Sequence, residues 1–182
     1  TLLVMISLGK KPQDFLALDP VTNVYRSRKE IPTETATVIM FICNHCPYVK
    51  HINEGLVAIG NDYIPQGVSF IAINSNDAEM YPQDGPEQMA EQSRTLGYPF
   101  PYLFDATQET ARAYQAACTP DFYIFDGNVQ CVYRGQFDSS RPSNTEPVTG
   151  RDLRAALDSL IDGRPVDENQ IQSIGCNIKW KR

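Results

Sequence analysis

Two cysteines, Cys43 and Cys46, stand three residues apart with His45 between them. An apolar run over residues 38–42 precedes the pair, and the segment that follows repeats its apolar residues at helical spacing. A dithiol at such a strand-to-helix junction can attack a disulfide with one sulfur and resolve the mixed disulfide with the other. We expect Cys43 to be the attacking thiolate, its pKa lowered below the free value of about 8.5 by the helix N-terminus and by His45. Cys46 is then the resolving thiol, and the motif predicts thiol–disulfide exchange.

Two other interpretations of this motif need no redox chemistry. A Cys-x-x-Cys pair can supply half of a zinc site, but structural zinc needs a second ligand pair at regular spacing. The remaining candidates stand alone in the sequence: His51, Cys118, Cys131 and Cys176. The pair can also form an inert structural disulfide. The strand before it and the helix after it favour the redox interpretation, and we predict neither a metal nor an organic cofactor.

The composition describes an ordinary globular chain whose length of 182 residues suits one domain. Its formal net charge of −6 argues against nucleic acid or an anionic membrane as the main partner. The odd number of cysteines, five, is typical of a reducing compartment with a catalytic pair, and predicts a cytoplasmic location. The apolar run over residues 2–6 is a poor signal peptide because no basic residue precedes it.

The elements around the motif alternate between strands and helices. We expect a hairpin of residues 14–18 and 21–25, a central buried strand at about 37–42, and further strands at 68–73, 102–104, 122–125 and 129–134. Helices follow the motif and the capping boxes that open at Asp84, Asp105 and Thr149. Parallel strand–helix–strand units followed by an antiparallel hairpin and a last helix predict a mixed sheet with helices on both faces.

In this order of elements the chain resembles the thioredoxin superfamily. Cys43-x-x-Cys46 after the central strand resembles its active-site motif. Thr119-Pro120, just before a strand, resembles its cis-proline loop, and Gly135 resembles its substrate-groove glycine. We therefore expect a cis peptide bond before Pro120.

The likeness is greatest to the peroxiredoxin-like group that carries a thioredoxin-type Cys-x-x-Cys motif. It rests on segments 118–122 and 174–181 and on the hairpin residues Pro12, Asp14 and Phe15. The resemblance implies one α/β domain over 1–182 with a thioredoxin fold: an N-terminal β-hairpin, a central mixed sheet flanked by helices, and a C-terminal tail. The core covers about 12–163, and tail 164–182 packs back on it.

The resemblance also assigns roles at the site. Thr119 and Pro120 would present a backbone edge to an extended substrate segment beside Gly135. Partners would be proteins or small molecules that carry thiols or disulfides, and electrons would come from another dithiol.

The remaining cysteines and the tail leave alternatives open. Ile171, Ile174, Ile178 and Trp180 make the tail too apolar to remain in water, so we expect them to dock it. Cys176 is either a small buried residue or an extra redox thiol that reaches Cys118 or the dithiol. Cys118 is either a packing residue or an additional redox thiol, because its loop should approach Cys43. Along one strand we expect Cys131 in the core and Arg134 as a surface charge.

These observations predict a thiol–disulfide oxidoreductase. The alternative is an antioxidant thiol peroxidase, in which Cys46 or Cys43 reacts with hydroperoxide. A third hypothesis is a noncatalytic metal-binding or adaptor module that uses Cys43, Cys46 and Cys176.

Overall fold

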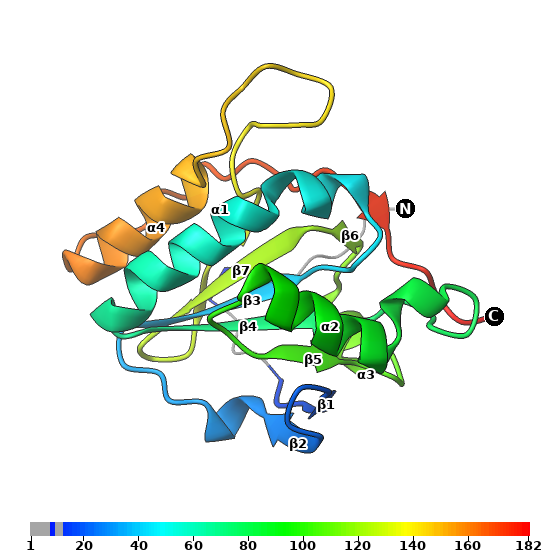
Figure 1. Ribbon diagram of the computed structural model, residues 1–182. Coiled ribbons are helices and arrows are strands. Elements are labelled where there is room, and N and C mark those ends of the chain that lie inside the picture. The colour runs from blue at the N-terminus through cyan, green and yellow to red at the C-terminus, as the bar shows by residue number, and fades with distance from the viewer. Residues whose placement is uncertain (1–7, 10–12) are drawn as a thin grey trace.

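The computed structural model describes residues 8–9 and 13–182 (Figure 1). The apolar run at residues 2–6 and the hairpin residue Pro12 lie outside the described residues. The strands are β1 (Leu16–Asp19), β2 (Val24–Ser27), β3 (Ala36–Phe41), β4 (Val68–Asn74), β5 (Tyr102–Phe104), β6 (Cys118–Thr119), β7 (Asp121–Asp126), β8 (Cys131–Gly135) and β9 (Cys176–Asn177). The helices are α1 (Pro47–Tyr63), α2 (Pro86–Leu96), α3 (Glu109–Tyr114) and α4 (Arg151–Ile161).

Strand β3 lies inside a mixed sheet of order β2-β1-β5-β4-β3-β7-β8. It pairs parallel with β4 and antiparallel with β7, and β4 pairs parallel with β5. All six residues of β3 are buried, as its continuous apolar sequence predicts for a strand covered on both faces. The predicted N-terminal hairpin forms at the sheet edge, where β1 pairs antiparallel with β2.

Alternate residues of β3 point into two separate cores, because side chains in a strand alternate between faces. Val38 and Met40 face the core that α1, α2 and α4 cover, while Ile39 and Phe41 face the core that α3 covers. Figure 1 shows α1 and α4 side by side above the sheet. The mixed sheet with helices on both faces is therefore confirmed.

None of the three predicted capping boxes forms. Helix α2 has Gly85 as its N-cap and α4 has Gly150, and neither helix has a side-chain cap from that residue. Gly150 has a φ of 71°, a left-handed conformation that residues with a Cβ rarely adopt. The N-cap of α3 is Gln108 rather than Asp105, although the Asp105 carboxylate accepts the N–H groups of Thr110 and Ala111.

The C-terminal tail runs back across the sheet, and its strand β9 pairs antiparallel with β6. Its apolar residues do not share one environment: Ile178 is 4% exposed, whereas Ile171 and Ile174 are 54% and 56% exposed. Trp180 lies against the guanidinium of Arg112, 4.5 Å from its ring centre. The prediction that Ile171 and Ile174 dock through their side chains is wrong, because polar and backbone contacts hold that part of the tail.

No helix in the described part of the chain combines the length and the apolarity that crossing a bilayer requires.

Candidate active site

The two motif cysteines occupy different positions relative to α1. The helix begins at Pro47 and Cys46 is its N-cap, whose carbonyl accepts the N–H groups of Val49 and Lys50. Cys43 lies three residues earlier, in the loop that leaves β3, and is outside the helix. Both side chains are buried. The positive end of the helix therefore acts on Cys46 rather than on Cys43.

The loop before β7 brings Thr119 against both sulfurs. Cys43 Sγ lies 3.5 Å from the hydroxyl of Thr119, and Cys46 Sγ lies 3.4 Å from its carbonyl oxygen. The peptide bond between Thr119 and Pro120 is cis. The residues that the family resemblance assigned to the substrate edge thus contact the dithiol directly.

Of the two motif cysteines, Cys46 has the lowered pKa. Its pKa is lowered to about 4, first by the Cys43 thiol that donates a hydrogen bond to it, with further help from the Cys176 thiol and the N–H of Val49. The pKa of Cys43 is raised, because it donates that bond, because it is buried, and because the Asp84 carboxylate is near. The prediction that Cys43 is the low-pKa thiol is wrong: the start of α1 at Pro47 places the helix N-terminus at the second cysteine.

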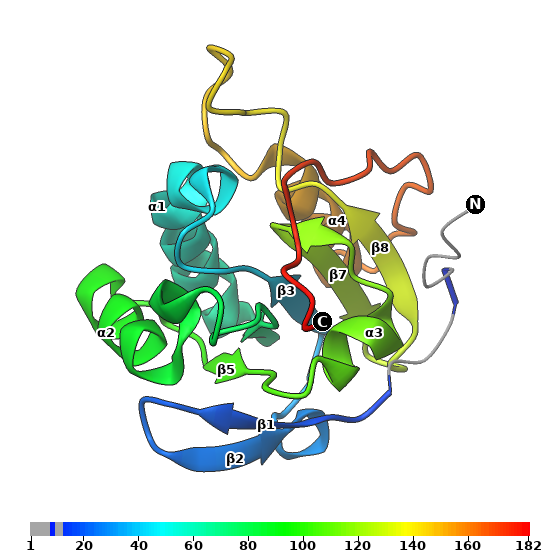
Figure 2. The ribbon, with the colours of Figure 1, turned by 90° about the vertical axis from the view of Figure 1, so that its right-hand side faces the viewer.

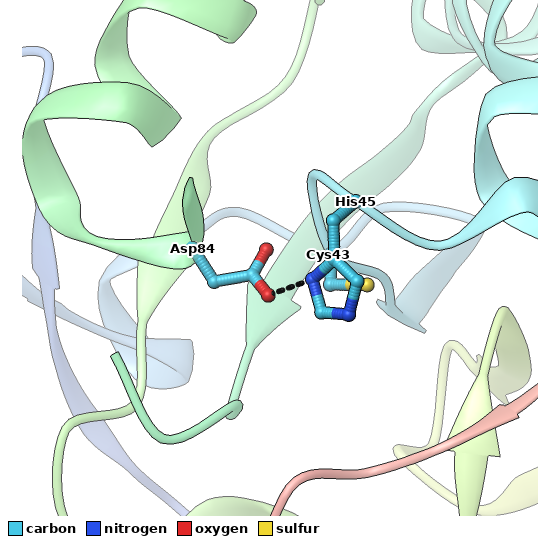
Figure 3. A group of neighbouring side chains, drawn as sticks. All are labelled: Cys43, His45 and Asp84. Atoms are coloured by element: carbon cyan, nitrogen blue, oxygen red, sulfur yellow. Dashed lines mark hydrogen bonds and ion pairs between the residues drawn. The ribbon is translucent and has the colours of Figure 1, made fainter. Parts of the chain in front are cut away.

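His45 interacts with a carboxylate that sequence reasoning had assigned to a helix cap. Asp84 closes one turn of 3₁₀ helix (Pro82–Asp84), is fully buried, and accepts a hydrogen bond from His45 Nδ1 (Figure 3). It also accepts the N–H of Asn44 at 2.7 Å and the side-chain amides of Asn74 and Asn76 at 3.2 and 3.0 Å. Because the carboxylate only accepts, Nδ1 carries the proton.

The His45 ring is held on its other side as well. It stacks on Tyr81 with ring centres 5.4 Å apart and planes 5° from parallel. His45 also lines an open groove of about 600 Å³ between α1 and α2, together with Lys50 and Gln88. Sequence reasoning did not place Asp84 at this site. Asp84 lies 40 residues after Asn44, and no local pattern in the sequence connects the two segments.

The residues around Asp84 suit a hydrogen-bond network better than a metal site. Within the described residues, ligand atoms gather at Cys43, His45 and Asp84, all within 4.8 Å of one another, and not at the predicted set of Cys43, Cys46 and Cys176. The four N–H donors on Asp84 already fill the four lone-pair positions of a carboxylate. The geometry fits a carboxylate that orients His45.

The tail covers the loop that the resemblance assigns to substrate binding. In the β6–β9 pair Thr119 stands opposite Cys176, and the Sγ atoms of Cys46 and Cys176 lie 2.6 Å apart. The tail also contacts the residue after Gly135: the N–H of Gln136 donates to the carbonyl of Ile171 at 2.9 Å. A Cβ at Gly135 would lie 2.5 Å from that same carbonyl oxygen, so the tail passes directly over the predicted groove glycine. Figure 2 shows the tail, in red, running in front of the end of β3.

Unlike Cys176, the residues Cys118, Cys131 and Arg134 form no hydrogen bond with either motif sulfur. The thiol of Cys118 faces the carbonyls of Pro120 and Ser173, and burial raises its pKa to about 12. Cys131 is in the core, as predicted, and burial raises its pKa to about 11. The prediction of a surface Arg134 is wrong: the side chain is buried, lies over the ring of Tyr123 and forms an ion pair with Asp121.

A mixed sheet flanked by helices, with a dithiol between β3 and α1, defines a thiol redox protein of the thioredoxin fold. The chain belongs to the AhpC/TSA family, whose model matches residues 8–134. No match is found among curated proteins.

Solved structures share this fold. An uncharacterized conserved protein from Geobacillus kaustophilus is 59% identical, with a TM-score of 0.96 over 98% of this chain and 94% of its own. A hypothetical protein from Sinorhizobium meliloti is 45% identical, with a TM-score of 0.94 over 97% and 96%. A putative thiol:disulfide interchange protein DsbE from Chlorobium tepidum shares the fold at 16% identity, with a TM-score of 0.66 over 85% and 98%.

Proposed function

We propose that this protein is a thiol–disulfide oxidoreductase in which the Cys46 thiolate attacks and Cys43 resolves. The observation that carries the proposal is the position of Cys46 at the N-cap of α1, with the Cys43 thiol donating to its sulfur. A thiolate at a helix N-terminus with a second thiol in reach has both groups that exchange requires.

The reaction proceeds in two balanced steps. Cys46 Sγ attacks one sulfur of a partner disulfide, so that a mixed disulfide forms and the other partner sulfur leaves as a thiolate. Cys43 then loses its proton and attacks Cys46 Sγ, which forms the Cys43–Cys46 disulfide and releases the second partner thiolate. The partner is reduced by two electrons and the protein is oxidised by two. Return to the dithiol needs electrons from another dithiol.

Hydroperoxide reduction is the second candidate function, and the burial of both sulfurs favours it. A small oxidant needs less access than a protein disulfide does. Cys46 would attack the terminal peroxide oxygen and release an alcohol, and Cys43 would condense with the resulting sulfenic acid to give the disulfide and water.

Single-turnover oxidation separates these functions. The fully reduced protein is mixed with oxidised glutathione, with insulin or with a hydroperoxide, and the loss of thiols is followed in time. Oxidoreductase function predicts faster loss with the disulfides, and peroxidase function predicts faster loss with the hydroperoxide. Cys46→Ser should abolish either reaction, and Cys118→Ser is the matched control that should retain it. An undiminished rate in Cys46→Ser would refute the assignment of the nucleophile.

A further inference from the structure

We infer that Cys176 is a third exchange thiol of this site, which forms a disulfide with Cys46 as an alternative to Cys43. This inference rests on the proposed function, because it takes Cys46 as the sulfur that partners attack. It assigns the tail strand β9 a chemical role: it presents a thiol to Cys46 from the side opposite the motif loop.

The first observation is the position of the two sulfurs. Cys46 Sγ and Cys176 Sγ lie 2.6 Å apart, and both are free thiols. Backbone pairing fixes this approach, since Cys176 stands opposite Thr119 in the β6–β9 ladder. The residue before Cys176 is Gly175, and its backbone lies so close to Thr119 that a Cβ on Gly175 would overlap the Thr119 carbonyl group. Only glycine permits this crossing, so the sequence is suited to placing Cys176 at the dithiol.

The second observation is that the tail is anchored on both sides of Cys176. Before it, the Ser173 hydroxyl donates to Asp121 at 2.9 Å and lies 2.6 Å from the carbonyl of Gly135. After it, the N–H of Lys179 donates to Asn76 Oδ1 at 2.8 Å, and the N–H of Asp77 donates to the carbonyl of Lys179 at 2.8 Å. These anchors are buried side chains and backbone groups, and they hold the tail on both sides of Cys176.

The third observation separates Cys176 from the remaining thiols. Cys118 is its neighbour across the ladder, one residue from Thr119, yet its thiol faces the carbonyls of Pro120 and Ser173. Cys131 lies in the other core, on the far side of the sheet from Cys46. Proximity to Cys46 is thus particular to Cys43 and Cys176.

The exchange steps balance without a further reagent. After a disulfide has reacted with Cys46, the Cys176 thiol loses its proton and attacks Cys46 Sγ, which forms the Cys46–Cys176 bond and releases the partner thiolate. Cys43 can then attack the same sulfur, so that the Cys43–Cys46 bond forms and Cys176 returns to the thiol. The second step transfers the disulfide within the protein and changes no net oxidation state.

Peptide mapping distinguishes these bonds because trypsin separates the thiols. Cys43 and Cys46 share the peptide 30–50, Cys118 and Cys131 share 113–134, and Cys176 lies in 155–179. Reduced full-length Cys43→Ser is treated with one equivalent of oxidised glutathione, quenched with N-ethylmaleimide in acid and digested. We expect peptide 30–50 joined to 155–179, and we expect this joined peptide also in Cys43→Ser/Cys118→Ser, the matched control.

Two further variants test the role of the thiol and of its placement. Cys43→Ser/Cys176→Ser should lose the joined peptide and retain glutathione on Cys46. Cys43→Ser/Gly175→Val keeps every relevant thiol but displaces the strand, and its yield of joined peptide should fall at least about tenfold, because a loosely tethered thiol replaces a fixed one. Circular dichroism checks that each variant is folded.

The possible outcomes distinguish failure of the Cys176 role from failure of the proposed oxidoreductase function. Glutathione on Cys46 without a joined peptide in Cys43→Ser would overturn the role of Cys176 and leave the proposed function standing. Absence of any glutathione or disulfide at Cys46 in every variant would instead overturn the proposed function. A joined peptide of 30–50 with 113–134 would assign the third thiol to the loop before β7, and would also overturn the inference.

Discussion

The ionisation of Cys46 is set by its immediate neighbours, and it can be measured one residue at a time. Its pKa of about 4 predicts that the ultraviolet absorbance of a thiolate appears as the pH rises through that value. Since the thiolate is the nucleophile, the rate of reaction with oxidised glutathione should hold a plateau at neutral pH and fall as the pH is lowered through the pKa. Cys46→Ser should remove this transition.

The matched variant is Cys43→Ser, which replaces the first of the donors to Cys46 by a hydroxyl. The transition should remain in this variant, because the hydroxyl can still donate to the Cys46 sulfur. A low-pH transition that survives in Cys46→Ser and disappears in Cys43→Ser would contradict this order of ionisation.

The sequence predicted the two thiols and their chemistry but not their order of ionisation. The order of ionisation depends on the residue at which α1 begins. Proline is favoured at the first helical position, so Pro47 already indicated that Cys46 is the N-cap. No comparable signal identified Asp84, because its contacts with Asn44 and His45 join segments that only the folded sheet brings together.

Asp84 gives a second prediction at this scale. Asp84→Asn replaces one acceptor oxygen by an N–H₂ group that meets donors, which should lower the free energy of unfolding by about 1–3 kcal/mol. Removal of its charge should also lower the pKa of Cys43. Asp162→Asn, at an exposed ion pair with Arg164, is the control and should change stability by no more than about 0.5 kcal/mol. Urea denaturation measures both, and equal losses would contradict the prediction.

Among the elements, the start of α4 depends on a glycine in contact with an aromatic ring. Gly150 has a φ of 71°, and a Cβ there would lie 2.7 Å from Phe137. Gly97, at the end of α2, has a φ of 69° with no atom within 4 Å of such a Cβ. Both alanine variants incur the left-handed penalty of roughly 1–2 kcal/mol, and Gly150→Ala adds an overpacking cost of about 1–3 kcal/mol. Thermal unfolding should therefore rank Gly150→Ala below Gly97→Ala, and the reverse order would show that Phe137 yields freely.

Element positions followed well from the sequence, whereas their ends did not. The apolar runs of β3 and β4 and the helical spacing in α1 located these elements to within a few residues, since burial dictates periodicity. The caps failed because Asp84 and Thr149 suit a helix start in isolation, while in the fold a glycine takes each N-cap.

At the scale of the molecule, the tail contributes one side chain, that of Ile178, to the core that α3 covers. Ile178 packs with residues of β3, β4 and α3, so Ile178→Ala should lower the free energy of unfolding by about 2–5 kcal/mol. Ile174→Ala is the matched control: its side chain is exposed, and the change should stay within about 0.5 kcal/mol. Similar effects of the two variants would show that the tail is held by its polar contacts alone.

The mixed sheet with helices on both faces followed from the alternation of elements, but its strand order and the path of the tail did not. Apolarity predicted that Ile171, Ile174 and Ile178 act alike, and the structure separates them: Ile178, directly after β9, is buried, whereas Ile171 and Ile174, before β9, are exposed. Pairing of a two-residue strand with a distant loop leaves no periodic signal in a sequence.

The covering of Cys46 by β9 has a consequence for the synthesis of the chain. A ribosome makes β3, α1 and the cis-proline loop before it makes residue 176, and domains fold from the N-terminus as they emerge. The nascent protein therefore carries its dithiol without this cover for the whole interval between translation of the motif and translation of β9. Newly made chains should react with small disulfides faster than completed ones, and the sulfurs become enclosed only when the C-terminal strand docks.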